Sequence, residues 1–162
     1  MTYHRTVEQI KDFLIKAGVW FETFEHAGVR TSEEAAKVRK GYSLKQGAKA
    51  IIIRVKNPEK KFLAMLVVPG DTRFNSDRVK RFFNSKDIRF ATEDEVKTIT
   101  GGVEFGGVPP FGNLFGLRVV VDPALFKNEK IIFNAGDRRF SVAMKSRDFR
   151  DLVKPEIESI IE

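Results

Sequence analysis

The chain has 162 residues, 42% of them hydrophobic, which suffices for one domain with its own core and is short for two, so we expect residues 1–162 to form a single domain. Its 29 Lys and Arg residues exceed its 22 Asp and Glu residues, and this net charge of +7 favours an anionic partner such as nucleic acid, although a solvated basic face explains the same excess. The absence of cysteine excludes disulfides, thiolate nucleophiles and Cys-based zinc sites.

The N-terminal segment passes directly into an amphipathic pattern and lacks the apolar core of a signal peptide. No run approaches the ~18 apolar residues that cross a bilayer. We therefore expect a cytoplasmic protein with no membrane partner.

Helical periodicity begins near the N-terminus, where Thr6 and Gln9 have the spacing of a capping box and apolar residues recur until Gly18. A second helix is predicted over 32–39, with Ser32 as its cap and acidic residues in its first turn. Apolar, β-branched runs predict strands. In the first half of the chain these strands are 19–24, 48–55 and 62–68, the last two joined by a turn at Asn57 and Pro58.

The second half continues with helices over 76–83 and 92–99, the latter opened by a capping box at Thr92 and Glu95. Hairpins mix with scattered helices, unlike the regular alternation of a doubly wound fold. We predict an α+β domain in which helices surround a central mixed, partly closed β-sheet. Its last elements are strands at 117–121, 131–134 and 140–144, turns at 122–123 and 134–137, and a helical tail interrupted by Pro155.

The segment from Gly101 to Gly112 carries glycine and proline at high density together with apolar residues, which predicts a loop of one rigid shape with few side chains above its backbone. A flexible spacer would be polar and rich in serine. Because such a loop lets another molecule approach its backbone closely, we interpret it as part of a site.

The inventory of reactive side chains excludes several mechanisms. There is no G-x-S-x-G elbow, and only His4 and His26 could act as imidazole bases. No H-E-x-x-H spacing or acidic cluster supports a metal, and the glycine-rich loop lacks the G-K-[ST] ending of a nucleotide-binding loop. We expect no metal and no cofactor, and a site built from backbone donors and a few polar side chains.

Three polar side chains are candidates for that site, and each has a structural alternative. Lys49 opens an apolar strand, where it must face water or an anion because unpaired burial costs several kcal/mol; a strand-end lysine that reaches solvent satisfies the same pattern. His26 could serve a ligand or bond to a backbone group. Thr31 could line a pocket or assist the cap of the helix that follows it.

A set of short motifs in a fixed order closely resembles the YbaK family and the editing insertion domain of bacterial prolyl-tRNA synthetases. The motifs are His26–Ala36, Gly47–Ala50, Gly106–Gly112, Val121–Asp122 and Asn134–Gly136. The resemblance extends over nearly the whole chain. It implies an editing-type fold and hydrolysis of the ester of wrongly aminoacylated tRNA.

The resemblance also implies roles for individual residues. Lys49 matches the essential lysine that engages the 3′ end of tRNA, and the loop from Gly106 to Pro110 matches the one that cradles the aminoacyl adenosine. Backbone N–H groups of Gly106 and Gly107 are then expected to face the developing oxyanion. Ser141 stands where the cysteinyl-tRNA deacylase branch has an aspartate, so that branch's amino-acid preference is not transferred. The residues expected to bind substrate are His26, Thr31, Val108, Pro109, Pro110 and Ser141.

The function implied is that of a trans-editing hydrolase that uses water to remove alanine, cysteine or a similarly small amino acid, with tRNA for proline as the expected carrier. Its partner is aminoacyl-tRNA, and a synthetase is left open as a second partner. The alternatives are a tRNA-binding or synthetase-associated module without catalysis, and a hydrolase of small aminoacyl esters or nucleotides. Candidate phosphate contacts, which an ordinary amphipathic helix would also place on its surface, are Lys37, Arg39, Lys40, Arg78, Lys80 and Arg81.

Overall fold

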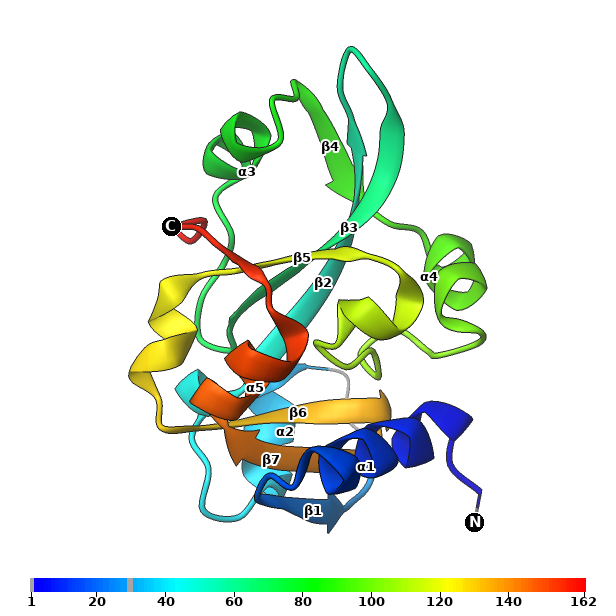
Figure 1. Cartoon of the computed structure of the whole chain (residues 1–162), viewed down its shortest axis with the longest axis vertical. Coiled ribbons are helices and arrows are strands. Elements are labelled where there is room, and N and C mark those ends of the chain that lie inside the picture. Colours follow the sequence, from blue (N-terminus) through cyan, green and yellow to red (C-terminus); the bar gives the residue numbers. More distant parts are fainter. Residues whose placement is uncertain (1, 29–30) are drawn as a thin grey trace.

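The computed structural model describes residues 2–28 and 31–162, and its strands form two sheets (Figure 1). A three-stranded antiparallel sheet has the order β1-β7-β6, with β1 at Phe21–Glu25, β7 at Phe140–Lys145 and β6 at Lys130–Asp137. A five-stranded mixed sheet has the order β4-β2-β3-β5-β8, in which β5 is parallel to both of its neighbours. Its strands are β2 (Ala48–Lys56), β3 (Lys61–Pro69), β4 (Asp87–Phe90), β5 (Arg118–Val121) and β8 (Glu156–Ile157).

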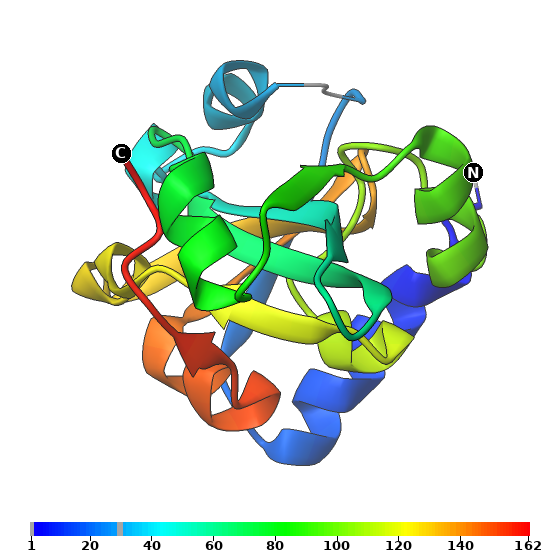
Figure 2. The same cartoon turned by 90° about the horizontal axis from the view of Figure 1, so that it is seen from above.

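Helices cover the outer surfaces of these sheets. α1 lies across the three-stranded sheet and packs on β6, whereas α3 and the β2–β3 hairpin occupy the opposite end of the molecule (Figure 1). α2 lies at the periphery when the molecule is viewed from above (Figure 2). The helices are α1 (Arg5–Ala17), α2 (Ser32–Val38), α3 (Ser76–Phe82), α4 (Glu93–Thr100) and α5 (Ser146–Val153), with short 3-10 turns η1 (Leu44–Gln46), η2 (Gly112–Phe115) and η3 (Pro123–Lys127).

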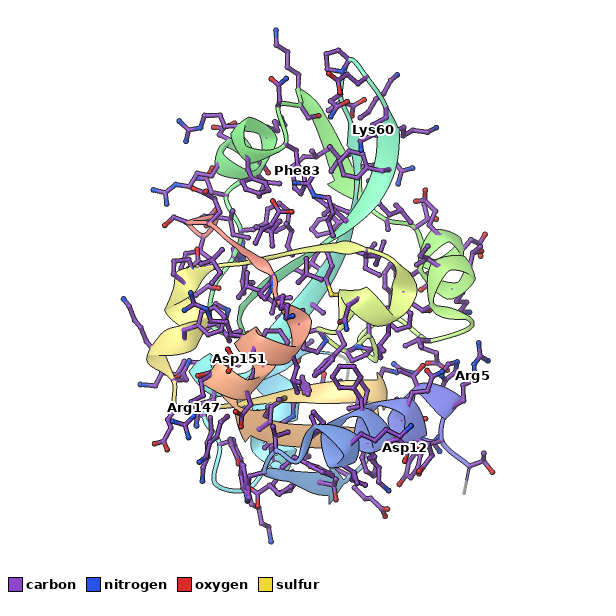
Figure 3. All side chains as sticks on the ribbon, in the orientation of Figure 1. Arg5, Asp12, Lys60, Phe83, Arg147 and Asp151 are labelled. Atoms are coloured by element: carbon purple, nitrogen blue, oxygen red, sulfur yellow. The ribbon has the colours of Figure 1, made fainter. Side chains whose placement is uncertain are left out.

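β3 is buried on both of its faces and contributes to two hydrophobic cores. Successive side chains of a strand point to opposite faces, so Met65 and Val67 join the larger core while Leu66 and Val68 join the smaller one. The smaller core lies under α3, where Phe83 packs edge-on against Phe62 with ring centroids 5.8 Å apart (Figure 3). The continuous apolar run of β3 thus joins both ends of the molecule.

The predicted α+β class with a mixed sheet is confirmed. The predicted partial closure of that sheet is not found, because the described strands form two separate sheets. The sheets meet at a parallel bridge between Gly47 and Ile132. The predicted helices and strands are present with small shifts of their ends, and the capping box of Thr92 and Glu95 is confirmed. No helix of the described residues is long and apolar enough to cross a membrane.

Two predicted helix caps are wrong by one or two residues. α1 is capped by His4, whose Nδ1 accepts the N–H of Thr6 at 3.1 Å, because Thr6 itself is buried inside the helix. α2 is capped by Thr31, whose hydroxyl oxygen accepts the N–H of Glu34 at 3.1 Å, and Ser32 is the first helical residue.

Three further elements differ from the sequence-based expectation. Residues 134–137 belong to β6 and contain a register shift, so their asparagine and glycine serve a bulge rather than a turn. The chain after Pro155 forms β8 beside β5, where strand pairing replaces the expected helix. β4 escaped prediction because its four residues are too short to show a periodicity.

The cap of α4 predicts a pH-dependent contribution to stability. The Glu95 carboxylate accepts hydrogen bonds from Arg89 and from the Thr92 N–H, and these lower its pKa from 4.5 to about 2. The ionised form is the one stabilised, so the contribution is complete above pH 4.5 and is lost as pH falls toward 2. We expect Glu95→Gln to lower the free energy of unfolding by up to about 1 kcal/mol at pH 7, with the difference vanishing near pH 2.

Urea denaturation of both proteins between pH 7 and pH 2 measures this difference. Glu93→Gln is the matched control, since Glu93 lies in the same helical turn and forms no ion pair with a described residue. A Glu95→Gln deficit that stays constant down to pH 2 contradicts the assignment.

Candidate active site

A pocket of about 130 Å³ lies where α2, the start of β2, the glycine-rich loop and β6 meet. An engineered cavity of about 150 Å³ holds benzene, so this volume suits a small group of about the size of an amino-acid side chain. Of the described residues that line it, none is acidic and none is histidine. They are Thr31, Ser32, Ala35, Ala36, Arg39, Leu44, Gly47, Ala48, Lys49, Ala50, Gly106, Val108 and Asn134.

Lys49 is the second residue of β2, and its ammonium group belongs to the lining of this pocket. Its Nζ donates to the backbone carbonyl of Thr72 at 2.7 Å. Burial lowers its pKa from the usual value, and the negative charge of Glu33 opposes that shift. Among the described residues no carboxylate forms an ion pair with it, so two N–H groups of the ammonium are available to a ligand.

Arg39 lies at the back of the pocket and belongs to a polar network with Ser141, Asn134 and His26. It is 8% exposed; its Nε donates to Ser141 Oγ and its Nη2 to Asn134 Oδ1, each at 3.0 Å. The Ser141 hydroxyl donates to Asn134 Oδ1 at 3.1 Å and lies 2.8 Å from His26 Nε2. Burial lowers the pKa of Arg39 to about 10, so the guanidinium is still charged at neutral pH.

The glycine-rich loop is fastened to β6 through its backbone. Asn134 Nδ2 donates to the Gly106 carbonyl at 2.6 Å, and Gly136 N–H donates to the Gly107 carbonyl at 2.8 Å. The Gly107 N–H donates to the Glu104 carbonyl at 2.9 Å. The N–H groups of Gly106 and Val108 form no hydrogen bond with the described residues, and both of these residues line the pocket.

The family model of the aminoacyl-tRNA editing domain matches residues 26–152, which span every residue of this pocket. This chain belongs to the aminoacyl-tRNA editing domain family. Among curated proteins it is similar to the multifunctional Ser/Thr-tRNA deacylase ProXp-y of Escherichia coli K12, with 30% identity over 153 residues that cover 94% of this chain and 90% of the relative.

A second relative of this editing domain is the proline–tRNA ligase of Fervidobacterium nodosum, 30% identical over 125 residues that cover 75% of this chain and 20% of the ligase. Among solved structures, a candidate trans-editing enzyme for prolyl tRNA synthetase superposes with a TM-score of 0.83 at 23% identity, covering 99% of both chains. That structure supports the fold.

The editing domain brings some of the predicted site residues together and places others behind the pocket. Lys49, Thr31, Gly106 and Val108 line it. His26 and Ser141 do not line it; Ser141 is hydrogen-bonded to the lining residues Arg39 and Asn134, and His26 is hydrogen-bonded to Ser141. His26 also bonds to a backbone group, since its Nδ1 lies 2.8 Å from the Ala27 carbonyl oxygen.

Two expectations need correction in this editing domain. The Gly107 N–H donates to the Glu104 carbonyl, whereas the N–H groups of Gly106 and Val108 form no hydrogen bond with the described residues. Pro109 and Pro110 are buried and do not line the pocket, because the chain turns inward after Val108 to place Phe111 in the core.

Arg39 and Asn134 line the pocket, whereas their sequence patterns predict a surface phosphate contact for Arg39 and a turn for Asn134. Arg39 is buried, whereas the neighbouring Lys37 and Lys40 are exposed. A usable signal was present, since Arg39 follows buried Ala35 by four residues and thus continues the buried face of α2. The only signal for Asn134 is its place in the motif Asn134–Gly136, on which the family resemblance rests.

Proposed function

We propose that this chain is a trans-editing deacylase that hydrolyses the ester of mischarged aminoacyl-tRNA. The observation that carries the proposal is the pocket itself, in which a lysine ammonium and open backbone N–H groups surround a volume suited to a small aminoacyl group. The deacylase name of the Escherichia coli relative supports the reaction class, and the ligase relative supports tRNA for proline as the carrier. The proposed substrates carry alanine, cysteine, serine or an amino acid of similar size.

The proposed reaction needs no covalent intermediate on the protein. Water adds to the ester carbonyl, and the N–H groups of Gly106 and Val108 donate to the resulting oxyanion, an interaction worth about 3 kcal/mol per donor in other hydrolases. The intermediate collapses with cleavage of the bond to the ribose oxygen, which takes up a proton and leaves as a hydroxyl. The products are a free amino acid and uncharged tRNA.

Lys49 is proposed to hold the ribose or the terminal phosphate of the substrate. Its ammonium is fixed by the Thr72 carbonyl, so little conformational entropy is lost when a second acceptor arrives. Because no acidic or histidine side chain lines the described pocket, we propose that the second ribose hydroxyl and backbone carbonyls orient the attacking water. Positioning and electrostatics then supply the rate enhancement.

The body of the tRNA is proposed to lie on the basic surface beside α3. A groove between α3 and the β2–β3 hairpin is lined by four basic residues and by two acidic ones, Asp77 and Asp87. Binding of tRNA there would release counterions and weaken with salt. We also propose that residues 1–162 act as one domain in the cytoplasm, where a synthetase can supply mischarged tRNA. The basic residues that line the groove are Lys56, Lys80, Arg81 and Lys86.

Single-turnover deacylation of tRNA for proline, charged in turn with alanine, cysteine, serine and proline, tests the proposal. We expect enzyme-dependent release of one or two of the small amino acids and stable prolyl-tRNA. Salt-sensitive tRNA binding without release of any amino acid would support the rival function, a tRNA-binding module without catalysis. The observation that favours this rival is that no acidic or histidine side chain lines the described pocket. Release from a small aminoacyl ester at the same rate as from tRNA would indicate a general esterase.

A further inference from the structure

Arg39 is a buried cation without a buried anion beside it. Its hydrogen-bond partners, Ser141 and Asn134, are neutral, and among the described residues no carboxylate forms an ion pair with it. A guanidinium that is only 8% exposed is costly to keep charged, and a purely structural role is usually served by a neutral donor or by a paired charge. Its place on the pocket wall offers a reason for the cost, namely that its remaining N–H groups can donate to the substrate.

The protein uses only one edge of this guanidinium. Nε and Nη2 donate to Ser141 and Asn134, whose oxygens are themselves hydrogen-bonded to each other, so that edge is held in a fixed orientation. Nη1 carries two further N–H groups and donates to no described residue. It lies beside Gly47, where a Cβ would come within 3.7 Å of it, so the missing side chain leaves this part of the pocket open.

We infer that Arg39 determines specificity by donating from Nη1 to an oxygen on the side chain of the bound amino acid, so that the pocket selects small hydroxyl-bearing amino acids over apolar ones of equal size. This inference rests on the proposed deacylase function. Repulsion between Arg39 and the α-ammonium of the aminoacyl group would turn the side chain toward Arg39. Lys49 would remain at the ester end.

The size of the pocket favours a hydroxyl over a carboxylate as the acceptor. Four alanines line the pocket, and its volume of about 130 Å³ is below that of an engineered cavity that holds benzene. A seryl or threonyl group is smaller than an aspartyl group by one or two heavy atoms, so it fits this space more easily. The alanines are Ala35, Ala36, Ala48 and Ala50.

The wild-type protein provides the first test, because threonine and valine have the same shape and differ by a hydroxyl. We expect single-turnover release from threonyl-tRNA to be at least tenfold faster than from valyl-tRNA, and release from seryl-tRNA at least tenfold faster than from alanyl-tRNA, all on the same tRNA. Equal rates within either pair overturn the inference, as does faster release from aspartyl-tRNA. If no aminoacyl-tRNA is cleaved at all, the proposed function itself fails.

Variants then assign the preference to Arg39. We expect Arg39→Met to lower the seryl rate by about ten- to a hundredfold more than the alanyl rate, so that the ratio of the two rates approaches one. Lys49→Ala is the comparison, since it removes the ammonium proposed at the ester end and leaves the hydrogen bonds of the guanidinium in place; it should lower both rates by a similar factor. An unchanged seryl-to-alanyl ratio in Arg39→Met contradicts the role of Arg39. Arg39→Lys, which retains the charge, gives the same comparison if the methionine variant does not fold.

Discussion

Replacing Lys49 by alanine is expected to lower the single-turnover rate of deacylation by about a hundred- to a thousandfold, the loss typical when one preorganised donor is removed from a hydrolase site. The structure gives the ammonium a fixed position, because Nζ is bound to the Thr72 carbonyl at the pocket. No other lysine lines the described pocket, so no neighbour can replace it. The rate is measured with excess protein over labelled aminoacyl-tRNA.

The fold should survive this change, since Lys49 is only half-buried and loses one hydrogen bond, worth about 1 kcal/mol. Lys45→Ala is the matched control. It removes the same charge from the neighbouring turn η1, where the side chain is exposed and lines no pocket wall. A Lys49→Ala protein that retains more than a tenth of the wild-type rate would show that the ammonium does not act in the reaction.

Replacing Gly136 by alanine is expected to lower the free energy of unfolding by about 2–4 kcal/mol, a large loss for one methyl group. The residue has φ +112°, a conformation that side chains rarely adopt. An added Cβ would also lie 2.6 Å from the Cβ of Thr6, inside the contact between α1 and β6. The Cβ of Thr6 is fixed to the backbone of α1, and the added Cβ would be fixed to the backbone of β6. The contact can therefore relax only if the helix moves away from the sheet.

The same substitution should slow deacylation, because the Gly136 N–H holds the Gly107 carbonyl and thereby the pocket loop. Urea denaturation and single-turnover kinetics measure the two effects. Gly18→Ala is the control: Gly18 has φ +69° and nothing within 4 Å of a Cβ, so backbone strain of about 1 kcal/mol is the whole expected cost. If the two variants are equally stable, the close approach of Thr6 has no energetic consequence.

The elements with strong local signals were predictable, and the differences occur where pairing with distant segments decides. The β2–β3 hairpin and the cap of α4 rest on residues close in sequence, and both are confirmed. Asn134 and Gly136 are typical of a turn, but pairing of β6 with β7 draws them into a strand with a bulge. Similarly, β8 forms because β5 leaves one edge available to the residues after Pro155.

The candidate site was predictable in part for the same reason. Lys49 stood out because a charge opens an apolar strand, and the glycine-rich loop stood out by composition. Arg39 did not, because a basic residue beside other basic residues is usually solvated. Its partners lie 95 and 102 residues away, so the local sequence does not indicate which groups it bonds to.

The sequence by itself determined the helices, the longer strands, the family resemblance, and the candidate role of Lys49, because these depend on residue types at short, fixed spacings. Only the tertiary structure decided which polar groups share one pocket. It placed Arg39 and Asn134 on the pocket wall and left His26 and Ser141 outside the lining. It also paired the Gly107 N–H with the Glu104 carbonyl. The physical reason is that a side chain's burial and its hydrogen-bond partners are set by contacts between distant segments, whereas local propensity acts over a few neighbouring residues.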